Sequence, residues 1–169
     1  FVLSMLDAHA ARLSTSLHQA HDELLKLALH DSLTRLPNRL LFADRLEQRI
    51  QECQHSQRSF SLLFLDLDGF KLVNDVYGHK AGDRVLVEVA RRIRAVLPAD
   101  GLAARLGGDE FAVLYDPVAA NMPYADLAAG LIAAVAQPFD GFDAGRLGMS
   151  VGICRLPADS LTDLLTRAD

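Results

Sequence analysis

The sequence is poor in residues that mark several common classes of protein. It has no tryptophan and two cysteines, Cys53 and Cys154, too few for a disulfide scaffold, and we interpret both as small buried side chains. Basic residues are outnumbered, with 17 Lys+Arg against 22 Asp+Glu and a net charge of -5. That balance argues against a protein that binds a nucleic-acid backbone through a basic face. The net charge does not exclude a phosphate ligand that binds together with a metal ion.

No apolar run is long enough to cross a membrane. The longest spans residues 127–136 and ends at Gln137-Pro138. The chain starts without the charged segment that opens a signal peptide, and it stops inside an expected helix. We therefore interpret it as a piece of a longer protein, and its 50% of apolar residues can still form a buried core.

Residues 1–30 carry apolar or small side chains at alternating spacings of three and four. These positions are Leu3, Leu6, Ala10, Leu13, Leu17, Ala20, Leu24 and Leu27. The spacing is that of a heptad seam, and no proline or glycine interrupts it. We expect a helix that pairs with a second copy in a two-stranded parallel coiled coil. The alternative is a single amphipathic helix that packs on its own domain.

Residues 31–169 have the mixed pattern of an α+β domain with a mostly antiparallel sheet flanked by helices. The run FSLLFLDL predicts a central strand over residues 60–67 that is buried on both faces. Further strands are expected over residues 102–106, 110–115 and 146–156, and the first two form a hairpin through Gly107-Gly108. Helices are expected over residues 40–52, 81–97 and 123–137, with another from Ser160. On the second helix, Arg91, Arg92 and Arg94 are expected to face solvent.

Acidic residues stand where two of these strands meet turns. Asp66 and Asp68 end the buried strand, and their i, i+2 spacing allows both to face one side. A pair of carboxylates at such a position indicates a cation site for Mg²⁺ or Mn²⁺, with a solvated turn as the alternative. In RLGGDEF (residues 105–111), two glycines leave backbone N–H groups open to a phosphate, and Asp109 and Glu110 follow at once.

Residues 70–83 (FKLVNDVYGHKAGD) combine a lysine that can pair with phosphate, Lys71, with two side chains that can read a purine edge, Asn74 and Asp83. Taken alone, each of these residues has a plain structural interpretation as a helix cap or a helix start.

Together these runs resemble the GGDEF family, the diguanylate cyclases. The resemblance covers most of residues 31–169 and rests on five motifs in the family's order: HDSLTRLPNR, LDLDGFK, NDVYGHKAGD, RLGGDEF and SVGI. It implies a fold similar to the palm of nucleotide polymerases and adenylyl cyclases. It also implies a reaction in the bacterial cytoplasm that joins two GTP molecules into cyclic di-GMP and releases two pyrophosphates.

By motif position, the resemblance implies a set of roles for the site residues. The implied ligands of Mg²⁺ (or Mn²⁺) are Asp66, the backbone carbonyl of Leu67, and Asp109. The implied GTP contacts are Asn74 and Asp83 at guanine, Gly69, Phe70 and Lys71 at the phosphates, and Gly107 and Gly108 in the hairpin. The implied catalytic residues are Asp66, Asp109 and Glu110, the last either as a metal ligand or as the base for the 3′-hydroxyl. Arg105 and His79 also occupy motif positions, without a settled role.

The resemblance also implies partners. One domain holds one GTP, so the reaction implies a homodimer that meets through the catalytic face and through residues 1–30, below an upstream sensor. The runs LFADRL and AQPFDGF are similar to members in which an EAL phosphodiesterase domain follows, whether or not the parent is membrane-anchored. Such hybrids raise an alternative function, a catalytically silent GTP-binding module that regulates the EAL domain.

Two departures from the family pattern carry expectations of their own. Pro98 and Gly101 replace the Arg and Asp of the family's Arg-x-x-Asp product-inhibition motif, so we expect no product inhibition through that site. The chain also stops before the helix that usually closes the domain.

Overall fold

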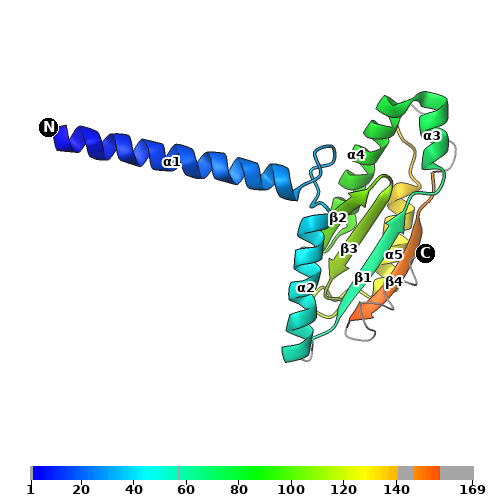
Figure 1. Cartoon of the computed structure of the whole chain (residues 1–169). Helices are drawn as coiled ribbons and strands as arrows, with labels where there is room; N and C mark the ends of the chain where they lie inside the picture. The colour runs from blue at the N-terminus through cyan, green and yellow to red at the C-terminus, as the bar shows by residue number, and fades with distance from the viewer. Residues whose placement is uncertain (1, 57, 141–146, 157–169) are drawn as a thin grey trace.

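A computed structural model describes residues 2–56, 58–140 and 147–156, and within them a long N-terminal helix leads into an α+β domain (Figure 1). The domain is built on a four-stranded antiparallel sheet with strand order β2-β3-β1-β4. The strands are β1 (Phe60–Asp66), β2 (Leu102–Gly107), β3 (Glu110–Tyr115) and β4 (Ser150–Leu156). The helices are α1 (Val2–Leu29), α2 (Arg39–His55), α3 (Phe70–Tyr77), α4 (His79–Val96) and α5 (Tyr124–Val135).

The sheet has a hydrophobic core on each face, and the central strand β1 supplies both. Phe60 and Leu62 pack with Phe42 of α2 on one face, while Leu63 and Leu65 lie in the larger core with residues of α4 and α5. This alternation follows from the two-residue period of a strand. The prediction of a central strand buried on both faces is therefore confirmed, as is the α+β fold.

Two elements differ from the sequence-based expectation, and one expected helix is not tested. Helix α3 was not predicted, because its eight residues between Gly69 and Gly78 are too few to show a helical period. Strand β4 begins at Ser150 rather than at residue 146, which itself lies outside the described residues. The expected helix from residue 160 also lies outside them.

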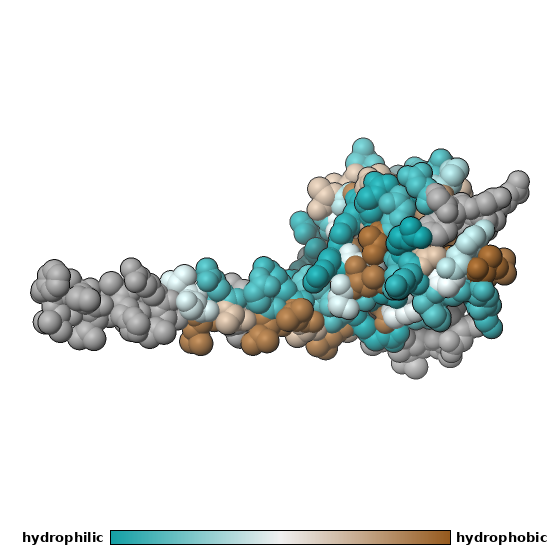
Figure 2. Space-filling model, turned by 90° about the horizontal axis from the view of Figure 1, so that it is seen from above, coloured by the Kyte–Doolittle hydropathy of each residue, from teal (hydrophilic) through white to brown (hydrophobic). Residues whose placement is uncertain are grey.

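Helix α1 extends away from the domain and leaves apolar side chains uncovered (Figures 1 and 2). Leu17, Leu24 and Leu27 are 72%, 64% and 64% exposed. These three seam residues are not packed on the domain, so the alternative of a helix covered by its own domain is not what the structure contains. No helix among the described residues is long and apolar enough to span a membrane.

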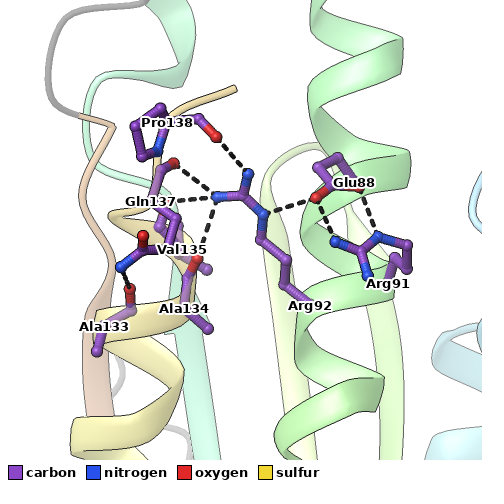
Figure 3. A network of polar contacts seen from close by, with 8 residues as sticks. All are labelled: Glu88, Arg91, Arg92, Ala133, Ala134, Val135, Gln137 and Pro138. Carbon is purple, nitrogen blue, oxygen red and sulfur yellow. Dashed lines mark hydrogen bonds and ion pairs between the residues drawn. The ribbon is translucent and has the colours of Figure 1, made fainter. Parts of the chain in front are cut away.

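The expectation that Arg92 faces solvent is wrong. The residue is 9% exposed, and its side chain donates to the carbonyl oxygens of Ala134, Val135, Gln137 and Pro138, at 2.7–3.2 Å (Figure 3). The Nε atom donates to Glu88 Oε1 at 2.8 Å, and the guanidinium lies 4.0 Å from the centroid of the Phe139 ring. Arg92 therefore satisfies carbonyls at and just beyond the C-terminal end of α5, which have no partner within the helix. We call these contacts the Arg92 network.

Candidate functional site

Three strands end or begin at the same end of the sheet and bring acidic residues together there. Asp66 closes β1 and lies opposite Glu110 at the start of β3, while Ser150 at the start of β4 lies on its other side. Asp109 is in the turn between β2 and β3, where it is half-buried. We call Asp66, Asp109 and Glu110 the acidic end.

The turn of this hairpin requires glycine, as predicted. Gly107 and Gly108 have φ angles of +148° and +51°, in the region that disfavours side chains. A Cβ atom at either position would meet no heavy atom within 4 Å, so open space lies beside the backbone here. The turn therefore exposes backbone to a ligand next to the acidic end.

The acidic end is electrostatically uncompensated. Burial raises the pKa of Asp66, and the charges of Asp109, Asp68 and Glu110 raise it further. Within the described residues neither Asp66 nor Asp109 forms an ion pair, and Glu110 has only Arg39, 3.5 Å away, with both side chains more than half exposed. Such an exposed pair contributes little. The arrangement favours a bound cation.

Asp68, which is near the acidic end, has hydrogen-bonding partners of its own in the chain. Its two carboxylate oxygens accept from Ser150 Oγ, at 2.9 and 3.0 Å, and its backbone exchanges two 3.1 Å hydrogen bonds with Gly148. These hydrogen bonds thus link the turn after β1 to the segment that precedes β4 and to the first residue of that strand. The charge of Asp68 nevertheless raises the pKa of Asp66, so the interpretation of Asp66 and Asp68 as one cation site stays a prediction.

The donors implied for a metal ion fit a hard divalent cation, although they are few. No group of three or more His, Cys, Asp or Glu side chains in the part of the chain that the structure describes is arranged to hold a metal. Asp66 and Asp109 provide two carboxylates, and the Leu67 carbonyl, which accepts from Phe70 N at 3.4 Å, adds an oxygen next to Asp66. Mg²⁺ commonly takes one or two carboxylates and completes its shell with phosphate oxygens and water.

The residues expected to contact GTP lie on α3 and at the start of α4. Gly69, with φ of +87°, precedes α3, and Lys71 is exposed on it. The side chain of Phe70 is in the hydrophobic core, so only its backbone is available to a ligand. Asn74 of α3 is half-buried, and Asp83 in the first turns of α4 is exposed. His79 is the exposed first residue of α4.

The turn between α1 and α2 contacts the hairpin, a contact that no sequence motif predicts. Arg105 Nη1 lies 3.1 Å from both carboxylate oxygens of Asp31, and its other nitrogens donate to the carbonyl of Gly108 at 2.7 and 3.0 Å. Arg39 Nε donates to the Leu106 carbonyl at 3.1 Å. Burial alone would raise the pKa of Asp31, but hydrogen bonds from Thr34 and Arg105 outweigh it and lower that pKa. This turn therefore holds the glycine hairpin in place.

The same turn is bonded to the end of α1. Asn38 donates through its backbone N–H to the Leu29 carbonyl at 2.9 Å and through Nδ2 to the Ala28 carbonyl at 2.7 Å. The Asn38 side chain also caps α2 by accepting from Leu41 N. One residue thus ties the last turn of α1 to the first turn of α2.

Pro98 and Gly101 lie in the turn after α4, where Gly101 N donates to the Pro98 carbonyl at 2.9 Å. A Cβ at position 101 would come within 2.7 Å of Leu97 Cγ, so a glycine suits this turn. The absence of product inhibition through these positions stays a prediction.

Comparisons with known proteins agree with the motifs. The family model described as "Diguanylate cyclase, GGDEF domain" matches residues 28–169. Among curated proteins, the chain is 48% identical over 171 residues to the bifunctional diguanylate cyclase/cyclic di-GMP phosphodiesterase MucR of Pseudomonas aeruginosa, covering 98% of this chain and 24% of MucR. It is 40% identical over 176 residues to the diguanylate cyclase TpbB of the same species, covering 99% and 39%. The chain thus spans about a quarter to two fifths of these relatives.

Among solved structures, the chain is similar to the coiled coil and GGDEF domain of DgcB from Caulobacter crescentus in complex with c-di-GMP. The TM-score is 0.82 at 28% identity, and the match covers 100% of this chain and 91% of that one. A GGDEF-domain structure of TpbB from Pseudomonas aeruginosa matches with a TM-score of 0.67 at 43% identity over 76% of each chain.

Proposed function

Because the chain belongs to the GGDEF domain family, we propose that it is a diguanylate cyclase domain that condenses two GTP molecules into cyclic di-GMP. The observation that carries the proposal is the acidic end. Its carboxylates are intact, and among the described residues their one ion-paired partner is the exposed Arg39. They also lie beside a glycine turn with open space around it. Charges that the fold leaves uncompensated are expected where a ligand supplies the compensation.

In this proposal each part of the site has a separate task. Asp66, Asp109 and the Leu67 carbonyl hold Mg²⁺ or Mn²⁺, which lowers the pKa of the attacking 3′-hydroxyl and offsets charge on the leaving pyrophosphate. Lys71 and the backbone of Gly69 and Phe70 orient the phosphates. The chain's own contribution is positioning and electrostatics, which supply most of the rate in phosphoryl transfer.

Glu110 keeps two open roles. It lies opposite Asp66 in the sheet, so its carboxylate belongs to the acidic end and could complete the metal shell or take the proton of the 3′-hydroxyl. Its exposure and its distant contact with Arg39 leave it free for either role.

The reaction requires two sites that face each other, and we propose that α1 brings two copies together. The seam residues Leu17, Leu24 and Leu27 are exposed on a helix of 28 residues, and a second α1 would cover them. Replacing Leu17 and Leu24 by Asp should abolish dimerisation of the full-length protein in sedimentation, together with its cyclase activity. Gln19→Asp plus Lys26→Asp, which places carboxylates off the seam, should leave both unchanged. Dimers that survive the seam variant would contradict this part of the proposal.

The direct test of the proposed activity is product formation. The full-length protein is incubated with GTP and Mg²⁺, and cyclic di-GMP is measured by chromatography. We expect product from the wild type and from Asp44→Asn, an exposed acid on α2, and none from Asp109→Ala. No product from a wild type that still binds GTP would contradict the cyclase. It would instead favour the second candidate, a catalytically silent GTP-binding module that regulates a phosphodiesterase domain.

A further inference from the structure

Gly82 is a glycine inside a helix, where the backbone does not require one. It lies buried in α4, and its φ angle is not in the left-handed region. Glycine is less favourable than alanine inside a helix because it loses more conformational freedom on folding. Backbone geometry therefore does not explain why glycine occupies this position. The explanation lies in the side chains that surround it.

A side chain at position 82 would collide with one particular neighbour. A Cβ atom built there overlaps Asn74 Oδ1 and comes within 3.0 Å of Asn74 Cγ, while Phe70 Cζ is 3.2 Å away. The atoms it would strike first belong to the side-chain amide of Asn74 and not to the backbone of α3. For comparison, a Cβ at the helical Gly130 would meet only Val96 Cγ1, at 3.1 Å. The Asn74 amide thus occupies the space that a side chain at position 82 would need.

The side-chain amide of Asn74 has no hydrogen-bonding partner in the described part of the chain. The side chain is half-buried, and no hydrogen bond of its Oδ1 or Nδ2 occurs within residues 2–56, 58–140 and 147–156. Asp83, the residue after Gly82, is exposed. An amide that can donate and accept therefore lies against the turn of α4 that carries the Asp83 carboxylate, and neither side chain has a described hydrogen bond. This pair complements the purine edge of guanine, which presents two donors and one acceptor.

We propose that Gly82 is a positioning residue for guanine recognition, because it gives the Asn74 amide the room to lie against the turn of α4 that carries Asp83. This inference rests on the proposed function, in which Asn74 and Asp83 recognise guanine. Any side chain at position 82 pushes the Asn74 amide away from the α4 backbone. GTP binding then loses its preference over ATP even though both recognition residues are still present.

A double-mutant cycle tests the inference through binding and stability rather than turnover. The variants are Gly82→Ala, Asn74→Ala and the two combined, in the full-length protein. The ligands are 3′-deoxy-GTP and 3′-deoxy-ATP with Mg²⁺, which lack the attacking hydroxyl. Calorimetry gives their affinities, and thermal unfolding gives the stability of each variant. Gly130→Ala in α5 is the matched control for adding a methyl group to a helical glycine.

We expect Gly82→Ala to weaken 3′-deoxy-GTP binding roughly tenfold, the equivalent of one net hydrogen bond, and to leave 3′-deoxy-ATP binding unchanged. In the Asn74→Ala background the same substitution should leave both affinities unchanged, since the collision with the Asn74 amide is gone and only the 3.2 Å contact with Phe70 Cζ remains. The unfolding temperature should then fall less than it does when Asn74 is present, because alanine favours the helix. Gly130→Ala should leave both affinities unchanged.

The inference is overturned if Gly82→Ala binds 3′-deoxy-GTP like the wild type. It is also overturned if the substitution has the same effect with and without Asn74, because the glycine would then serve only the packing of α3 on α4. These outcomes are distinct from failure of the proposed function. A wild type that makes cyclic di-GMP but shows no coupling in the cycle refutes only the role of Gly82. A selective loss of guanine binding in a protein that makes no product refutes only the cyclase.

Discussion

Charged side chains gather in two regions of this molecule, the Arg92 network and the acidic end, and the fold treats them in opposite ways. In the Arg92 network a buried guanidinium contacts four carbonyl oxygens, a carboxylate and an aromatic ring. At the acidic end, three carboxylates share one strand boundary with a single exposed arginine 3.5 Å from Glu110.

The pKa shifts of the carboxyl groups in the two regions are opposite in sign. Hydrogen bonds from Arg91 and Arg92 lower the pKa of Glu88 to about 2. Burial and neighbouring carboxylates instead raise the pKa of Asp66. The first region stabilises its charges from within the chain, whereas the second destabilises them until something else is bound. Charge alone therefore does not mark a binding site. A charged side chain that has no partner in the chain is the better indicator.

The largest effect should come from removing a charge that the fold leaves without a partner. Asp66→Asn should lower cyclic di-GMP formation roughly 1,000-fold, on the scale of losing a preorganised electrostatic contact. In metal-free buffer at pH 7 the same variant should unfold at a higher temperature than the wild type, because it removes repulsion. A variant that loses both activity and stability would break the comparison.

The pH dependence of wild-type stability has a definite sign here. The pKa of Asp66 is raised in the folded state, so the folded state binds the proton more tightly than the unfolded one. The stability contribution of this residue is therefore fully present below its unfolded pKa and is lost as the pH rises through the folded pKa. Asp66→Asn should remove that part of the pH dependence.

The Arg92 network should show the converse, a loss of stability. Arg92→Ala leaves the carbonyls at the end of α5 and the Glu88 carboxylate without their partner, and we expect it to lower the free energy of unfolding by about 3 kcal/mol. Chemical denaturation measures this. Arg91→Ala is the matched control, since Arg91 also pairs with Glu88 but is 68% exposed, and it should change stability by less than about 1 kcal/mol. Equal losses for the two arginines would contradict the assignment.

The ion pair between Asp31 and Arg105 lies next to the acidic end, and we expect it to stabilise the fold as the Arg92 network does. Their side chains are 21% and 12% exposed, and Asp31→Asn should cost about 2 kcal/mol at pH 7. The pKa of Asp31 is lowered, so its stabilisation is present above its unfolded pKa and is lost as the pH falls through the folded pKa. A variant whose stability matches the wild type at pH 7 would show that the pair contributes nothing.

The smallest effect is expected at Asp68, an acid near the acidic end that has its partner in the chain. Ser150→Ala removes the hydroxyl that donates to it and should cost about 1 kcal/mol of stability. Asp68→Asn, which can still accept from Ser150, should retain activity within roughly tenfold of the wild type. If Asp68→Asn were as inactive as Asp66→Asn, the distinction between partnered and unpartnered carboxylates would fail.

Much of this fold could be predicted from local pattern. The alternation in FSLLFLDL, the paired glycines of the hairpin and the seam of α1 each follow from a period or a turn requirement that the sequence displays. Helix α3 was not predicted in this way, because its eight residues between two glycines of positive φ are fewer than the stretch over which a helical period is recognised.

The partners of the charged residues could not be predicted from local sequence pattern. Arg92 lies on α4 among two other arginines, and its carbonyl acceptors are 42–46 residues away in the sequence. Asp31 and Arg105 are 74 residues apart. Both positions lie in runs whose composition suggests a solvated helix or a simple turn. Only the tertiary structure separates a paired charge from an unpaired one.

The most direct test of the central claim is whether nucleotide binding at the acidic end depends on a divalent cation through its carboxylates. Calorimetry compares binding of 3′-deoxy-GTP with and without Mg²⁺ in the wild type and in Asp109→Asn. We predict that Mg²⁺ tightens binding at least roughly tenfold in the wild type and has no effect in the variant. Equal wild-type binding without Mg²⁺, or a full Mg²⁺ effect in Asp109→Asn, would contradict the account.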